Sequence, residues 1–121
     1  MLMWLFERFS HLPALITQYA TTQAPKTYSL TRQTIQIGAV RYRNCVAVAI
    51  DPQGLYLRIN TVFKKYPQIC IPWKAFNTMQ ASRIYAKQAI QFSIGEAEVG
   101  TLRIPDSLYQ QIIPYLINPC F

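Results

Sequence analysis

The sequence predicts a mainly β domain in which about seven antiparallel strands lie between an N-terminal helix and a C-terminal helix. Apolar residues recur at three- and four-residue steps near both ends of the chain and at two-residue steps between them. Turn-forming residues divide the central part at short intervals. Because 121 residues is the length of one domain, we expect a single domain over 1–121, with a β-barrel over 26–104.

The composition excludes several classes of protein. Apolar residues make up 51% of the chain and charged residues 14%, which excludes an intrinsically disordered protein and a solvated coiled coil. No stretch reaches the roughly 18 apolar residues that a membrane-spanning helix needs. The apolar segment 1–6 has no leading basic residue and is a poor signal peptide. An odd number of cysteines without such a signal favours reduced thiols and a cytoplasmic location.

The first predicted element is a helix over 1–20. Its apolar positions include Phe9, Leu12 and Ile16, which share one helical face. Pro13 removes a backbone N–H inside this pattern, so we expect a kink or a restart of the helix at that point.

The most clearly predicted strands form a hairpin. Residues 34–37 alternate with a period of two, and the polar run 41–44 is predicted to be an exposed connection. Residues 45–50 are apolar throughout, as in a strand buried on both faces. Asp51–Gly54 has Asp, Pro and Gly where a type I turn favours them. Segments 45–50 and 55–59 should therefore pair through this turn.

The second half of the predicted sheet is less regular. The alternation in 55–59 places Tyr56 and Arg58 on the outer side of the strand. Pro72 ends a short strand, and Lys87 and Gln88 are predicted to form a turn. The remaining strands are predicted over 68–71, 78–85, 89–94 and 98–104.

The last predicted element is a helix over 105–117. Pro105 fits a first helical turn, and the carboxylate of Asp106 suits the positive end of the helix dipole. Leu108 and Ile112 form an apolar stripe at helical spacing. This helix should pack on the sheet.

Several short motifs resemble a set of small bacterial proteins of unknown function. These motifs are Gly54–Leu57 (GLYL), the segment Ile69–Trp73 that ends in IPW, and Leu102–Pro105, while Leu15–Tyr19 is similar to the leading helix of those proteins. Strands followed by one amphipathic helix also resemble the order of pleckstrin-homology-like (GRAM/PH-like) domains. The resemblance implies a partly open barrel with its last helix at one end, and it implies no catalytic residue. Phe63–Pro67 departs from the pattern, which often has His and paired prolines there.

Few residues are suited to catalysis. His11 is the only histidine, and Glu96 and Glu98 lie in or beside a predicted turn. Cys45 and Cys70 lie in apolar runs and are expected to be small core residues. No cluster supplies three metal ligands. We therefore expect a protein that is not an enzyme and that needs no cofactor and no metal.

The excess of basic residues is not explained by the fold. The chain has 12 Lys and Arg against 5 Asp and Glu, a net charge of +7. Arg41 and Arg43 fall in one predicted connection and Lys64 and Lys65 in another, and Lys74 is a further candidate. Loops of a barrel gather at its ends, so these cations could share one rim that attracts an acidic protein, an anionic lipid or a nucleic acid. The alternative is that they are solvated loop charges.

A second candidate contact is the apolar start of the chain. Trp4, Leu5, Phe6 and Phe9 are bulky for an exposed helix. They either pack on the barrel as added core or contact a membrane or a second subunit.

These features favour a non-enzymatic binding module. Its expected partner is another protein or a second copy of the chain, joined through the apolar helix or a sheet edge. One alternative is a peripheral membrane module that binds anionic lipid through basic loops and the N-terminal helix. Nucleic-acid binding is a second alternative, weakened by the lack of a recognisable motif.

Overall fold

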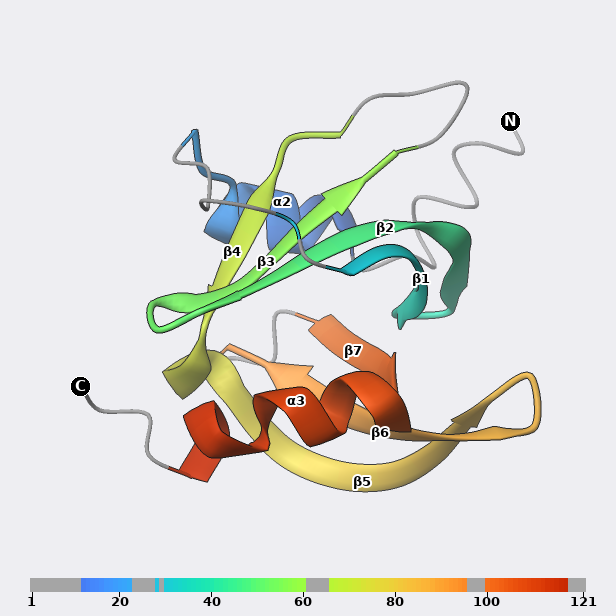
Figure 1. Cartoon of the computed structure of the whole chain (residues 1–121). Coiled ribbons are helices and arrows are strands. Elements are labelled where there is room, and N and C mark those ends of the chain that lie inside the picture. The colour runs from blue at the N-terminus through green and yellow to red at the C-terminus, as the bar shows by residue number, and fades with distance from the viewer. Residues whose placement is uncertain (1–11, 23–27, 29, 61–65, 96–99, 118–121) are drawn as a thin grey trace.

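The computed structural model describes residues 12–22, 28, 30–60, 66–95 and 100–117 (Figure 1). Within these residues the chain forms seven strands, two α-helices and one short 3-10 helix. In chain order the elements are α2 (Leu12–Tyr19), β1 (Leu30–Ile37), β2 (Val40–Asp51), β3 (Gly54–Ile59), β4 (Ile69–Pro72), η1 (Trp73–Ala75), β5 (Phe76–Ile84), β6 (Lys87–Ile94), β7 (Gly100–Pro105) and α3 (Asp106–Ile117).

The seven strands form one antiparallel sheet in the order β4-β3-β2-β1-β7-β6-β5. The register between β1 and β7 is short, with Gln36 opposite Arg103 and Ile37 opposite Leu102. Figure 1 shows the sheet curling there, so that β1 to β4 form the upper half and β5 to β7 the lower half of a half-barrel. The predicted mainly β class with a flanking helix on each side is confirmed, and the arrangement is consistent with a pleckstrin-homology-like barrel.

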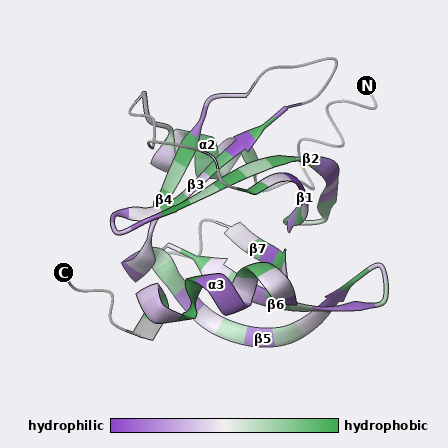
Figure 2. Ribbon diagram, viewed as in Figure 1, coloured by the Kyte–Doolittle hydropathy of each residue, from purple (hydrophilic) through white to green (hydrophobic). Residues whose placement is uncertain are grey.

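The core fills the space between the two halves of the curled sheet. Five strands each contribute a fully or almost fully buried side chain to it: Val48, Leu57, Ile71, Phe92 and Leu102. Figure 2 shows β2 hydrophobic along its middle and hydrophilic at its bend, as its sequence requires. The core also includes Leu12, Leu15, Ile35, Ile37, Val46, Leu55, Ile69, Ile94, Ile104, Leu108 and Ile112.

The two helices close the core from different sides. Leu12 and Leu15 of α2 are buried, and the chain after α2 joins the outer edge of β4 through a bridge between Ala20 and Ile69. Pro13 lies in the first turn of α2, where its missing N–H costs little; the rest of the predicted helix over 1–20 lies outside the described residues. The predicted C-terminal helix is confirmed as α3, but it begins at Asp106, because Pro105 is the last residue of β7 and not part of the first helical turn.

The predicted hairpin is confirmed. Its strands pair in register from Val46 opposite Ile59 to Asp51 opposite Gly54, with a two-residue turn between them. The Asp51 carboxylate accepts a hydrogen bond from the backbone N–H of Gln53 at 2.9 Å, which is the local bond that makes Asp a turn-forming residue.

Two of the sequence motifs lie on adjacent strands. The four residues of β3 that carry GLYL pair with β4 from Gly54 opposite Pro72 to Leu57 opposite Ile69. A Cβ at position 54 would lie 2.4 Å from the backbone oxygen of Ile71, so only glycine fits there. The motifs therefore determine a strand pairing and not a chemical site.

The predicted exposed connection over 41–44 is wrong, because these residues belong to β2. The chain reverses earlier, at Gly38 and Ala39, where Gly38 has a φ of 63°. Gly adopts that conformation without steric cost. The alternation Arg–Tyr–Arg is that of a strand with one solvated face, since Arg41 and Arg43 are exposed and Tyr42 packs against the core.

The predicted turn at Lys87 and Gln88 is also misplaced, because both residues belong to β6. The turn consists of Tyr85 and Ala86, whose φ angles are 50° and 67°. Two central residues with positive φ define a type I′ turn, which usually contains Asn and Gly. Local sequence therefore does not indicate this turn.

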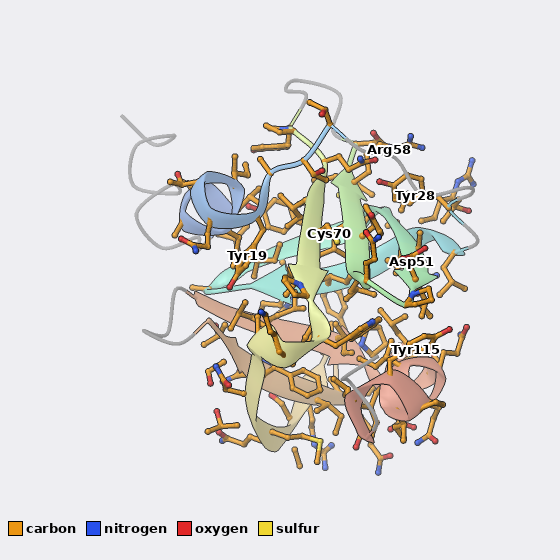
Figure 3. The ribbon with its side chains drawn as sticks, turned by 90° about the vertical axis from the view of Figure 1, so that its left-hand side faces the viewer. Tyr19, Tyr28, Asp51, Arg58, Cys70 and Tyr115 are labelled. Atoms are coloured by element: carbon orange, nitrogen blue, oxygen red, sulfur yellow. The ribbon has the colours of Figure 1, made fainter. Side chains whose placement is uncertain are left out.

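Tyr56 was expected on the outside of β3, and it is buried, with 4% of its surface exposed. Tyr28 lies over this side of the sheet: its hydroxyl donates to the side-chain oxygen of Gln68, and the guanidinium of Arg58 lies 4.4 Å from its ring centre. Figure 3 shows Tyr28 and Arg58 beside each other near the β3–β4 pair. The expected exposure of Arg58 is confirmed.

Candidate functional site

A groove with a volume of about 480 Å³ lies between the β1–β2 pair and the β5–β6 hairpin. Its lining includes three cations, Arg32, Arg43 and Lys87, and no carboxylate. We call this feature the basic groove. Uncharged polar side chains complete most of its wall: Gln33, Thr34, Asn44, Gln88 and Ser107.

The strand register places further basic residues beside the groove. Gln36 on β1 is opposite both Arg41 on β2 and Arg103 on β7, and Arg103 is opposite Gln91 on β6. Residues that are opposite one another in a sheet share a face. Arg41 and Arg103 therefore lie on one face of the sheet, which is the face away from the core because the neighbouring Ile37 and Leu102 are buried inside.

Amide oxygens orient the Arg103 side chain on this face. Its Nε and Nη2 both donate to Oε1 of Gln91, at 3.2 and 2.7 Å. Its Nη1 donates to the backbone oxygen of Arg83 at 3.0 Å and to Oε1 of Gln36 at 3.5 Å. These uncharged partners position the guanidinium without cancelling its charge.

Tyr85, at the tip of the β5–β6 hairpin, contacts Arg41 and Arg43 of β2 with its ring. The Cζ atom of Arg41 lies 4.3 Å from the centre of the Tyr85 ring, and that of Arg43 lies 5.6 Å from it. Cations are attracted to the face of an aromatic ring at such distances. Because Tyr85 is still 51% exposed, the arrangement remains open to solvent.

The described residues contain no ion pair that would neutralise these cations. Asp51 and Asp106 are the acidic residues in the described part of the chain. Asp51 lies at the β2–β3 turn, where its carboxylate bonds to Gln53. Asp106 lies in the first turn of α3, beside the wall of the groove but outside its lining.

Strained backbone is concentrated at the basic groove. Within the described residues, the non-glycine residues with positive φ are Arg32, Asn44, Tyr85 and Ala86. The first three line the groove, and Ala86 adjoins the third. Thr34 supports the bend at Asn44, since its Oγ1 accepts the backbone N–H of Asn44 at 3.0 Å. Strained positions of this kind often cluster at functional sites.

The structure brings together only part of the predicted basic rim. Arg41 and Arg43 lie together over Tyr85. Lys74 is exposed in η1, at the start of β5, whereas Tyr85 follows the end of that strand. Figure 1 shows these two ends of β5 on opposite sides of the molecule. Lys64 and Lys65 lie outside the described residues.

Sequence reasoning missed the other residues of the groove. Arg32 lies at a register shift between β1 and β2, and Lys87 follows a turn that has no turn-forming residue. Arg103 reaches this face through a pairing between β1 and β7 that is distant in sequence. The only local signal was the clustering of charge.

The remaining candidates for contact or catalysis lie outside the described residues. They are Trp4, Leu5, Phe6, Phe9, His11, Glu96 and Glu98.

Cys45 and Cys70 were expected in the core, but both are half-buried free thiols outside it. Burial raises the pKa of Cys45, and it raises that of Cys70 despite an opposing hydrogen bond with Tyr56. Both therefore remain protonated thiols at neutral pH, whereas a nucleophilic cysteine needs a lowered pKa. In the described part of the chain, no group of three or more His, Cys, Asp or Glu side chains could hold a metal ion.

The two edges of the sheet differ in whether another part of the described chain bonds to them. At β4, the N–H of Thr21 donates to the backbone oxygen of Gln68 at 2.9 Å, so the chain after α2 covers that edge. At the other edge, β5 pairs only with β6 among the described strands. Its residues 77–81 are all exposed, and Met79 is 59% exposed. This edge offers unpaired backbone groups to another strand.

No described helix is both long enough and apolar enough to cross a membrane. No protein-family model, curated protein or solved structure matches the chain.

Proposed function

We propose that this protein is a non-enzymatic protein-interaction module that associates with a second copy of itself through the open edge at β5. The observation that carries the proposal is the contrast between the covered edge at β4 and the open, exposed edge at β5. The same edge would accept an extended strand of a different protein. The proposal includes a cytoplasmic location and membership of the small bacterial proteins with GLYL and IPW motifs.

The register of β5 predicts how two copies pair. Ile84 and Lys87 flank the two-residue turn, so they form a hydrogen-bonded pair. Counting back in steps of two, Gln80 directs its backbone groups toward β6, whereas Met79 and Ala81 direct theirs away from it. Two antiparallel copies can then place each Met79 opposite the Ala81 of the second copy, with the two Gln80 residues facing each other at the symmetry axis.

This register opposes no like charges. The basic residue of β5 is Arg83, and this alignment brings it toward the stretch between Phe76 and Met79 of the second copy. That stretch carries no charged residue, and the register of β5 with β6 shifts within it. A side-chain hydrogen bond links β5 to β6, since the hydroxyl oxygens of Thr78 and Ser93 lie 2.6 Å apart.

Charged substitutions of Gln80, which lies at the symmetry axis of the proposed dimer, test the proposal. In Gln80→Lys two lysines would face each other, and in Gln80→Glu two glutamates would, so each variant alone should be monomeric. An equimolar mixture should restore the dimer, because Lys then faces Glu. Sedimentation velocity up to about 1 mM protein measures this, since a small interface binds weakly.

The control is Gln53→Lys, which adds the same charge at the exposed β2–β3 turn and should leave association unchanged. A wild-type protein that stays monomeric over the whole concentration range overturns the proposal. So does a mixture of the two Gln80 variants that sediments no faster than either variant alone.

A further inference from the structure

The basic groove is separate from the edge that carries the proposed function, and its chemistry points to a ligand of its own. We infer that the groove is a binding site for a phosphate-bearing anion, held by Arg32, Arg43 and Lys87. The phosphate can belong to a soluble phosphate ester or to the headgroup of a lipid.

The groove carries an excess of positive charge that would attract an anion. Three cations line a volume of about 480 Å³ with no carboxylate among them. The side chains of Arg32 and Lys87 make no hydrogen bond or ion pair with another described residue. Holding like charges around one space raises the energy of the empty site, and an anion that enters it lowers that energy.

One of the three cations, Arg43, is positioned before the anion arrives. The ring of Tyr85 lies 5.6 Å from the Cζ atom of Arg43 and 4.3 Å from that of Arg41, on the side of the hairpin tip. The positive φ of Asn44 bends β2 next to Arg43, and Thr34 fixes that bend by a 3.0 Å hydrogen bond. Arginine positioned in this way loses less freedom when it binds.

The mixture of donors favours phosphate over a single carboxylate. Two guanidinium groups offer planar pairs of N–H donors that match phosphate oxygens, and the ammonium group of Lys87 adds a compact charge. Gln33, Gln88 and Ser107 also line the groove, and they offer amide and hydroxyl groups to the remaining oxygens or to a substituent, although the Gln33 Nε2 already donates to the Thr31 backbone oxygen at 3.1 Å. The volume lies in the range of small-molecule sites, so it can hold a phosphate together with a group of the size of glycerol or a sugar.

A titration of the full chain with pyrophosphate tests the site directly, with the chemical shifts of the backbone amides as the readout. We expect saturable shifts at Asn44, Tyr85 and Gln88, and weaker binding at raised ionic strength. Sodium chloride at equal ionic strength is the control and should not reproduce the shifts. Shifts of equal size around Lys74 and Arg58 would mean unspecific attraction to all cations and would overturn the inference.

Substitutions test the assignment of residues. Lys87→Gln should weaken pyrophosphate binding about fivefold, and Arg32→Gln, Arg43→Gln and Lys87→Gln together should weaken it about 100-fold. Lys74→Gln removes the same charge outside the groove and should have no effect. If the triple variant does not fold, the Lys87→Gln variant alone tests the site, because the Lys87 side chain is exposed and makes no described contact that the fold needs. Unchanged affinity in a folded variant overturns the inference.

Two arms separate the sources of phosphate. Glycerol phosphate serves as the soluble ester, and vesicles of phosphatidylcholine with phosphatidic acid serve as the lipid. Binding of the ester alone assigns a soluble ligand, and groove-dependent sedimentation with the vesicles assigns a lipid headgroup. Binding of neither probe, with no response to pyrophosphate, overturns the site.

Discussion

Tyr85 and Ala86 occupy backbone conformations that side chains disfavour, with φ angles of 50° and 67°. A residue with a Cβ costs about 1 kcal/mol or more in this region, and glycine avoids that cost. The stacking of Arg41 on Tyr85 offsets part of the strain at the first position. No described contact of that kind supports Ala86.

We expect Ala86→Gly to stabilise the protein by about 1 kcal/mol, because glycine accepts the positive φ without a steric clash. The urea midpoint of unfolding measures this change. The type I′ turn should persist, so Tyr85 should still contact Arg41.

Ala39 provides the matched control for that substitution. It lies in the two-residue turn between β1 and β2, and its φ is not positive, unlike that of Gly38. Ala39→Gly should therefore lower stability by about 0.5 kcal/mol, because glycine adds freedom only to the unfolded chain. Equal effects at positions 39 and 86 would contradict the argument from backbone strain.

At the scale of elements, the pairing of β3 with β4 depends on the absence of one side chain. Gly54→Ala would place a Cβ 2.4 Å from the backbone oxygen of Ile71, which cannot move without breaking the pairing. We expect a loss of more than about 2 kcal/mol of unfolding free energy. Thermal or urea unfolding measures the loss.

The neighbouring Gln53→Ala is the control for this element. Gln53 is exposed in the turn, and its interaction with Asp51 uses the backbone N–H, which alanine keeps. It should change stability by less than about 0.5 kcal/mol. If Gly54→Ala is as mild as Gln53→Ala, the close approach of β3 and β4 does not limit position 54.

The sequence predicted those elements that end at residues with a known preference for turns. The hairpin through Asp51–Gly54 was predictable because the carboxylate and the glycine each have a local role in the turn. The turn at Tyr85 and Ala86 was not, because tertiary contacts stabilise a conformation that these residues disfavour alone. The charges of 41–44 were misread as a loop because a solvated strand face and a solvated loop have similar composition.

The basic groove was harder to predict than the strands around it. Arg41 and Arg43 were identified from their clustering, but Lys87 comes close to Arg32 and Arg43 only after β1, β2 and β6 have joined one sheet. Lys87 is more than 40 positions away from Arg32 and Arg43 in the sequence. A one-residue shift of register would move these side chains to the other face, and local sequence does not fix the register at the bulges in β1.

At the scale of the whole molecule, four buried or half-buried acids link folding to proton binding. Burial raises the pKa of Cys45, Cys70, Tyr28 and Tyr56. Each group binds its proton more tightly in the folded than in the unfolded protein. Raising the pH above the unfolded pKa values therefore favours the unfolded chain.

We expect stability to change little between about pH 7 and pH 8 and to fall above about pH 8.5, where unfolded thiols begin to ionise. Urea unfolding at several pH values measures the slope. The loss of net positive charge on the way to the isoelectric point acts in the opposite direction. A variant with Cys45→Ala and Cys70→Ala isolates the thiol contribution, and its stability should fall less steeply. An identical slope in both proteins would contradict the linkage.

Trp73 gives the molecule a built-in optical reporter. Its indole is 4% exposed, stacks on Phe76 at 5.5 Å and on Tyr115 at 5.2 Å, and donates from Nε1 to the Asp51 backbone oxygen at 2.8 Å. It therefore contacts β5, α3 and the β2–β3 turn at once. In a Trp4→Phe variant all indole emission would come from Trp73, because the chain has two tryptophans. Fluorescence would then shift to longer wavelength when any one of these three elements separates from the others, even where the sheet stays intact.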